Sequence, residues 1–289
     1  MNLRHIVVAA DESDAGRQAV RAGLDLAARA AARLTVMRAA SVRAIPLVGA
    51  MAGGSEDTEL DGAGMALERL QRWLAADGIP AGSGVPVELG IAFGVPGIET
   101  CRFAEQRAAD LLVLGRKHRS PMARLLVGDT ADAVLRRSRV PCLFVQPGSG
   151  PFREALVALD GSDRGMRVLI ATRGFARSVG AAVRAVTVED HEPSRAPAPA
   201  VPLTRSSRLQ QQVASIASRE TGTHHVEDSG VAIRRGPIVR EILAEVADSD
   251  PDVLAFGYHR GGPPGIIEGS STARQLAHTA PVSVLAIPL

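Results

Sequence analysis

Residues 109–118 read ADLLVLGRKH and residues 251–261 read PDVLAFGYHRG, so one pattern occurs twice in the chain. Each copy has an acidic residue, a short apolar run, a glycine and then a polar loop. A short apolar run that ends in glycine and a polar loop is typical of a buried strand. This pair of segments is the first sign that the chain repeats a whole fold.

The repeat extends in both directions from this pattern. Downstream, VGDTAD at 127–132 matches EGSSTA at 268–273. Upstream, HIVVAADES at 5–13 matches ALVALDGS at 155–162. Matched positions lie about 140 to 150 residues apart, which is the length of a domain rather than of a solenoid unit. We therefore expect two domains, residues 1–147 and 152–289, joined by a Pro-Gly-Ser-Gly-Pro hinge at 147–151.

Composition limits the possible functions. The chain has 289 residues, of which 46% are hydrophobic but only 3% aromatic, so the core must consist of Ala, Val, Leu and Ile. The formal net charge is +2, which provides no electrostatic footprint for nucleic acid or for an anionic membrane. Two cysteines without metal-ligand spacing predict neither a disulfide framework nor a zinc site. Without a signal peptide or a long apolar run, we expect a cytoplasmic protein.

Apolar runs and helical periodicity alternate along both halves. This alternation predicts an α/β fold with a parallel sheet that is covered on both faces. Ligands of such sheets bind beyond the carboxyl ends of the strands, where the strand order reverses. In the first half, we expect strands at residues 3–10, 34–37, 85–92, 111–114 and 142–145. We expect one helix that ends at Ala32 and further helices at 58–76, 94–109 and 128–138. The second half predicts strands at 155–160, 182–188, 224–233, 252–257 and 282–287, and helices at 163–179, 204–220, 237–248 and 271–279.

These residues resemble the universal stress protein family, and the resemblance covers essentially the whole chain, twice. The family pattern after the fourth strand is G-x2-G-x9-G-[ST]. The resemblance implies two tandem domains, each a five-stranded parallel sheet of order 3-2-1-4-5 with helices on both faces, like the adenine nucleotide alpha hydrolases. Many members bind ATP, with an acidic residue after the first strand on the nucleoside and the glycine loop on the phosphates. Others lack the glycines and are not thought to bind nucleotide.

In the first half the pattern is incomplete. The outer glycines, Gly115 and Gly128, are thirteen positions apart, as the family pattern requires. However, His118 stands in place of the middle glycine, and Asp129 replaces the Ser or Thr. A β-carbon crowds the loop at the first position, and a carboxylate repels phosphate at the second. The candidate nucleotide-binding residues here are Asp11, Gly115, Gly128 and Thr130.

The second half keeps more of the pattern, so we expect nucleotide binding more here than in the first half. The loop is one residue shorter, and Arg260 occupies the place of the middle glycine. Gly-Ser-Ser-Thr at a helix start supplies backbone N–H groups and hydroxyls to an anion. The candidate residues are Asp160, Gly257, Gly261, Gly269, Ser270 and Ser271.

Simpler structural roles remain open for several of these residues. Asp11 and Asp160 are either nucleoside ligands or local turn formers. Ser13 and Ser162 are predicted to be helix N-caps rather than nucleophiles. No catalytic constellation, Walker-type loop or metal site is predicted, so we expect a binding protein and not an enzyme, with a weak ATPase left open.

We expect a stress-response protein that binds an adenine nucleotide such as ATP. The alternative is a protein-interaction or regulatory module that has lost the nucleotide. By analogy with family members that dimerise through the last strand, residues 142–145 and 282–287 should pair antiparallel and form an intramolecular pseudo-dimer. Such pairing would cover two strand edges that are otherwise bare. A further homodimer is left open.

Overall fold

A computed structural model describes residues 1–40, 56–79, 84–116, 129–189, 209, 213, 231–259 and 270–289. Strands and helices alternate in both halves, as the sequence predicts. The first half contains β1 (His5–Ala9), α1 (Asp14–Ala30), β2 (Arg33–Ala40), α2 (Glu56–Ala76), β3 (Val87–Phe93), α3 (Pro96–Gln106), β4 (Leu111–Gly115), α4 (Asp129–Arg137) and β5 (Cys142–Val145). The second half contains β6 (Glu154–Leu159), α5 (Asp163–Val179), β7 (Ala182–Glu189), β8 (Val231–Arg235), α7 (Ile238–Ser249), β9 (Val253–Tyr258), α8 (Ser270–Thr279) and β10 (Ser283–Pro288).

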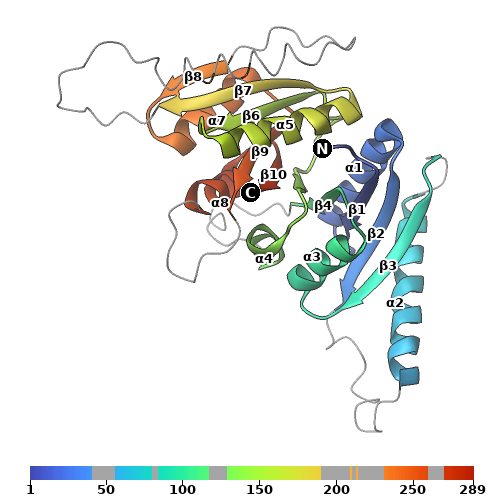
Figure 1. The fold of residues 1–289 in the computed structure, drawn as a ribbon. Helices are drawn as coiled ribbons and strands as arrows, with labels where there is room; N and C mark the ends of the chain where they lie inside the picture. The colour runs from blue at the N-terminus through green and yellow to red at the C-terminus, as the bar shows by residue number, and fades with distance from the viewer. Residues whose placement is uncertain are drawn as a thin grey trace, which may run out of the picture.

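The ten strands in the described part of the chain form one sheet in the order β3-β2-β1-β4-β5-β10-β9-β6-β7-β8. Each half has the order 3-2-1-4-5 and is parallel throughout. The halves join where β5 pairs antiparallel with β10, with Phe144 opposite Val284 and Cys142 opposite Ala286. The predicted antiparallel pairing of the last strands is therefore confirmed. Figure 1 shows the two halves on either side of this seam.

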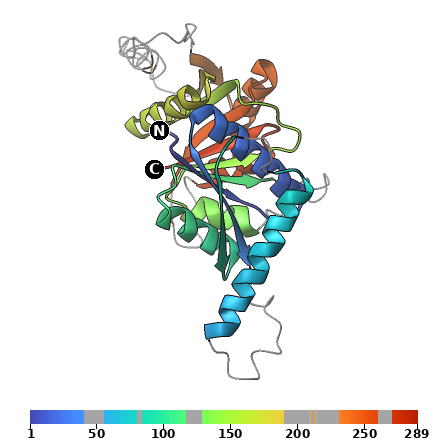
Figure 2. The ribbon, with the colours of Figure 1, turned by 90° about the vertical axis from the view of Figure 1, so that its right-hand side faces the viewer.

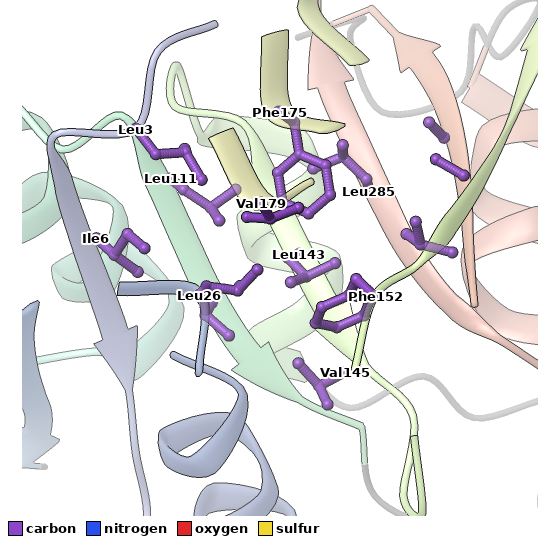
Figure 3. Close-up of a cluster of buried hydrophobic side chains, with 14 of the residues drawn as sticks. Leu3, Ile6, Leu26, Leu111, Leu143, Val145, Phe152, Phe175, Val179 and Leu285 are labelled. Carbon is purple, nitrogen blue, oxygen red and sulfur yellow. The ribbon is translucent and has the colours of Figure 1, made fainter. Parts of the chain in front are cut away.

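Two apolar clusters, one on each face of the sheet, fill the core. One cluster packs β1 and β6 against α1 and α5, and the other packs the opposite face against α3, α4, α7 and α8. Each cluster contains residues from both halves, so the seam lies inside the core rather than between two cores. Figure 3 shows one cluster at the seam, where Leu26, Leu111 and Leu143 of the first half face Phe152 and Leu285 of the second.

The first helix of each half starts at the predicted serine. Ser13 Oγ accepts a hydrogen bond from the Gly16 amide at 3.3 Å, and Ser162 Oγ accepts one from Gly165 at 3.1 Å. These bonds satisfy backbone N–H groups that have no partner within the first turn of a helix. The predicted role of both serines as N-caps is confirmed.

Several element boundaries differ from prediction by a few residues. The helix expected over 58–76 begins at Glu56, within a stretch expected to be a loop, and the strand expected over 85–92 spans Val87–Phe93. Figure 2 shows that α2 projects beyond the sheet. Most of the helix expected at 204–220 and the first part of the strand expected at 224–233 lie outside the described residues. None of the described helices is long and apolar enough to cross a membrane.

Candidate functional site

A cavity of about 730 Å³ opens at the carboxyl ends of β6, β7 and β9 in the second half. In the sheet, β6 lies between β9 and β7. The chain passes from β6 to β7 and β8 on one side, and then crosses over to β9 on the other side. This is the point at which the strand order reverses, where parallel α/β sheets bind their ligands. The volume is in the range of small-molecule sites. The residues at this edge therefore form the candidate site.

Asp160 lies at this edge, immediately after β6, and lines the cavity. Its Oδ1 atom accepts hydrogen bonds from the Ser162 amide at 3.0 Å and from the Ser162 hydroxyl at 2.7 Å. Within the described part of the chain, Oδ2 makes no hydrogen bond. One carboxylate oxygen thus forms the turn before α5, and the other is available to accept from a ligand. The two roles that the sequence leaves open for this aspartate are compatible.

The end of β7 adds polar groups to the same cavity wall. The Thr187 hydroxyl donates to the Leu159 carbonyl at 3.0 Å and so ties β7 to β6. Glu189 lines the cavity, and its Oε2 atom accepts from Arg235 Nε at 3.1 Å. Because two carboxylates line the cavity, its mouth favours ligand groups that donate hydrogen bonds, such as ribose hydroxyls or an exocyclic amine.

The remaining wall is mostly apolar. It combines side chains from the strand ends with side chains from the first turns of α7 and from α8. An apolar wall with a few polar groups is typical of a small-molecule site. The apolar lining residues include Val186, Val188, Ile238, Ile242, Phe256 and Leu276.

Helix α8 brings its N-terminal half to the cavity through Thr272 and Ala273. The first backbone N–H groups of a helix have no partner inside the helix and carry partial positive charge, which favours an anion. Ser270 and Ser271 begin α8, but their side chains lie outside the described residues, as do Gly261 and Gly269. The structure thus places Asp160, Gly257 and the start of α8 around one cavity.

Gly115 at the end of β4 and Gly257 near the end of β9 each allow a helix to pack closely against the strand. A Cβ atom at Gly115 would lie 1.9 Å from the Ala15 carbonyl oxygen in α1. A Cβ atom at Gly257 would lie 2.7 Å from Val168 Cγ2 in α5 and 2.7 Å from Leu289 Cδ1. Neither glycine adopts a positive φ. Close packing against neighbouring side chains and backbone, rather than an unusual backbone conformation, therefore accounts for both glycines.

The corresponding edge of the first half carries an ion-pair network. The Glu12 carboxylate is bound by Arg38, at the end of β2, and by Arg69 of α2. The hydrogen bond from Arg69 lowers the pKa of Glu12, with smaller contributions from the charges of both arginines. By register, Ala9 pairs with Met37 and Ala158 with Val186, so Arg38 occupies the position of Thr187 in the second half. The two edges therefore differ in charge and in the side chains that cross them.

Among the first-half candidates, Asp11 and Ser13 repeat the turn seen at Asp160. Asp11 Oδ1 accepts from the Ser13 amide at 3.2 Å and from its hydroxyl. Thr130 lies in the first turn of α4, where its backbone approaches Gly97 of α3. Gly128 lies outside the described residues.

Several residues that line the cavity are not among the site residues predicted from the sequence. Thr187 and Glu189 at the end of β7, Ile238 at the start of α7, and Gly165 in α5 all line the cavity. The signal that could have found the β7 residues is their position next to β6 at the strand-order reversal. Within the described ranges, no group of three His, Cys, Asp or Glu side chains is arranged to hold a metal ion.

Comparison with known proteins agrees with this fold and its repeat. A sequence profile of the Universal stress protein family matches residues 2–146 and again residues 151–288. The chain therefore belongs to the universal stress protein family and carries the family's domain in tandem.

Individual relatives point the same way. A universal stress protein of Methanocaldococcus jannaschii is 29% identical over 147 residues, which are 50% of this chain and 82% of the relative. A universal stress protein of Mycolicibacterium smegmatis is 39% identical over 66 residues, 22% of this chain and 51% of the relative. The crystal structure of a universal stress protein from Archaeoglobus fulgidus superimposes with a TM-score of 0.73 and 17% identity, and covers 98% of both chains. At that identity, the last comparison supports the tandem fold alone.

Proposed function

We propose that this protein binds an adenine nucleotide such as ATP in the cavity of its second half. The observation that carries the proposal is the cavity itself, which brings Asp160, Gly257 and the N-terminal half of α8 to one strand-order reversal. Asp160 and Glu189 would accept from the nucleoside, the apolar wall would contact the base, and the start of α8 would face the phosphates. The two domains in this proposal are residues 1–147 and 152–289.

The first half differs from the second at the corresponding edge of the sheet. Arg38 and Arg69 both engage Glu12 at the edge where a nucleoside would enter. This charged network occupies the edge that carries Thr187 in the second half, so the first half presents a nucleoside with a different arrangement of charge. We therefore propose one nucleotide per chain, bound by the second half.

The test is calorimetric titration of the full chain with ATP and Mg²⁺, together with mass spectrometry of small molecules released on denaturation. The informative variant is Asp160→Asn, which keeps an Oδ1 acceptor for Ser162 but removes the negative charge. We expect it to weaken nucleotide binding about tenfold, because a charged hydrogen bond is lost. Asp11→Asn makes the same change in the first half and should leave binding unchanged.

A second candidate function is a protein-interaction or regulatory module without nucleotide. The departures from the family pattern at His118, Asp129 and Arg260 favour it. No bound or released nucleotide and no heat on titration would support this alternative and contradict nucleotide binding. Phosphate release that depends on Asp160 would instead indicate a nucleotide hydrolase.

A further inference from the structure

The side chain of Arg116 crosses the seam between the two halves. Arg116 directly follows Gly115 at the end of β4, in the first half. Its Nη1 atom donates to the carbonyls of Ala280 at 2.8 Å and Val282 at 3.0 Å, and its Nη2 atom donates to the carbonyl of His278 at 3.1 Å. All three acceptors lie at or just beyond the C-terminal end of α8, in the second half.

One of these acceptors, the His278 carbonyl, belongs to the last turn of α8, and the other two follow the helix. The last carbonyls of a helix have no intrahelical partner and carry partial negative charge. A guanidinium presents several donors in one plane, and hydrogen bonds from a charged donor are stronger than neutral ones. Burial lowers the pKa of Arg116, but from so high a starting value that the group keeps its charge. Arg116 therefore caps α8 from the other half of the molecule.

Tyr258 makes the corresponding contact in the opposite direction. It follows Gly257 at the end of β9, as Arg116 follows Gly115 at the end of β4. The Tyr258 hydroxyl donates to the Ser138 carbonyl at 3.0 Å, just beyond α4 of the first half. Each half thus holds the end of the other's last helix with the residue that follows its β4 or β9 glycine. The two contacts differ in strength, because one donor is a cation with three acceptors and the other is a neutral hydroxyl.

Helix α8 also forms part of the cavity wall. Thr272, Ala273 and Leu276 of α8 line the cavity, while Arg116 binds the carbonyl of His278 in the last turn and that of Ala280 just beyond it. A helix of ten residues is about 15 Å long and moves nearly as a rigid rod. A second contact restrains its middle, where Arg274 Nε donates to Asp132 Oδ1 of α4 at 3.2 Å. The first half therefore restrains α8 at its C-terminal end and in its middle, in addition to the packing of α8 within its own half.

We propose that Arg116, a residue of the first half, is a positioning residue for the cavity of the second half. It acts through α8 and does not itself line the cavity. The inference rests on the proposed function in that the positioned cavity takes a nucleotide. Its structural part, that Arg116 fixes α8, can be measured without any ligand.

The experiment compares three variants of the full chain: Arg116→Met, Arg116→Lys and Tyr258→Phe. Amide hydrogen exchange is followed without ligand in α8 and α4. We expect Arg116→Met to speed exchange in residues 274–279 roughly tenfold, because three charge-assisted hydrogen bonds are lost. Arg116→Lys keeps the charge and should restore part of the protection. Tyr258→Phe is the matched control: it removes the reciprocal bond and should speed exchange in α4 while leaving α8 unchanged.

Binding of ATP with Mg²⁺ provides the second measurement. Arg116→Met should weaken binding at least about threefold, Arg116→Lys less, and Tyr258→Phe not at all. If the unmodified chain binds no ATP, the proposed function fails, while the exchange comparison still decides the role of Arg116. Unchanged α8 exchange in Arg116→Met overturns the inference. So does an equal rise in α8 exchange in Tyr258→Phe, since that would indicate general weakening of the seam.

Discussion

Gly165 lies so close to Asp160 that a Cβ atom at position 165 would stand 2.5 Å from the Asp160 Oδ1 atom. The same relationship occurs in the first half, where a Cβ at Gly16 would lie 2.1 Å from the Asp11 carbonyl oxygen and 3.0 Å from its Oδ1 atom. In both halves the glycine lets the first turn of a helix approach the aspartate that follows the first strand. Residue 165 therefore helps to fix the carboxylate that we assign to the nucleoside.

Substitution of Gly165 by Ala should displace the Asp160 carboxylate. We expect a loss of about 1–3 kcal/mol in the free energy of unfolding, from overpacking, and weaker binding of ATP by titration. Gly150→Ala is the control, because a Cβ there meets no atom within 4 Å and the residue has no positive φ. Unchanged stability in Gly165→Ala would contradict the close contact.

Substitution of Gly64 by Ala should have the opposite sign. Gly64 lies in α2, and an added Cβ would meet nothing within 4 Å. Because glycine costs about 1 kcal/mol relative to alanine in a helix, the variant should be more stable by about that amount. Urea denaturation measures the change. Gly90→Ala should instead destabilise the chain, since its Cβ would lie 2.4 Å from Phe103 Cζ.

Truncation of Phe175 should destabilise both halves together. Its ring is fully buried and packs edge-on against Phe152, with 6.3 Å between ring centroids, in a cluster that includes residues of the first half. We expect Phe175→Ala to cost about 3–5 kcal/mol. The single tryptophan, Trp73, reports on the first half, so its fluorescence transition should also shift to lower denaturant.

The control for Phe175 is Ile170→Ala on the same helix. Ile170 is 52% exposed, so its truncation should change stability by less than about 1 kcal/mol. A Trp73 transition that stays in place in Phe175→Ala would mean that the two halves unfold independently.

Stability should fall in mild acid because of His278. Its Nε2 atom lies 3.4 Å from Asp132 Oδ1 without forming a hydrogen bond. Burial lowers the pKa of His278 below 6.5, and the nearby Asp132 charge opposes this shift without cancelling it. The unfolded chain therefore takes up a proton first as the pH falls. The stability that neutral His278 contributes is fully present above about pH 7. It is lost as the pH falls from 6.5 to the lower pKa of His278 in the folded chain.

Denaturation midpoints at pH 8 and pH 5.5 test this for the unmodified chain and His278→Gln. The unmodified chain should lose more stability between the two pH values than the variant does. Equal losses would show that His278 titrates alike in the folded and unfolded chain.

Both cysteines should resist modification in the folded protein. Burial raises the pKa of Cys101 and of Cys142 to about 12, and the thiolate is the reactive form. At pH 8 we expect no reaction of the native chain with Ellman's reagent, and two equivalents after denaturation. A thiol that reacts at full rate in the native chain would contradict the burial of that residue.

The sheet can largely be predicted from the sequence, because short apolar runs indicate both the repeat and the buried strands. The N-caps follow from Ser13 and Ser162, and the antiparallel seam follows from the family's dimer. The cavity is harder to predict. Glu189 ends a strand like many other residues, and only the strand order places it beside Asp160.

The contacts across the seam are beyond sequence reasoning for a different reason. Arg116 and Tyr258 hold matched positions after Gly115 and Gly257, but one side chain is a cation and the other a neutral phenol, so the sequence does not predict a shared role. Their relationship appears only when the antiparallel pairing of β5 and β10 brings each to the helix end of the other half.

That antiparallel pairing also has an evolutionary consequence. In an assembly of two separate identical subunits, every substitution appears on both sides of the symmetry axis at once. Here the two copies are encoded in one gene and always meet each other, so each can change alone. One copy can acquire a charged network of Glu12 with Arg38 and Arg69 at its edge, while the other carries the cavity beside Asp160.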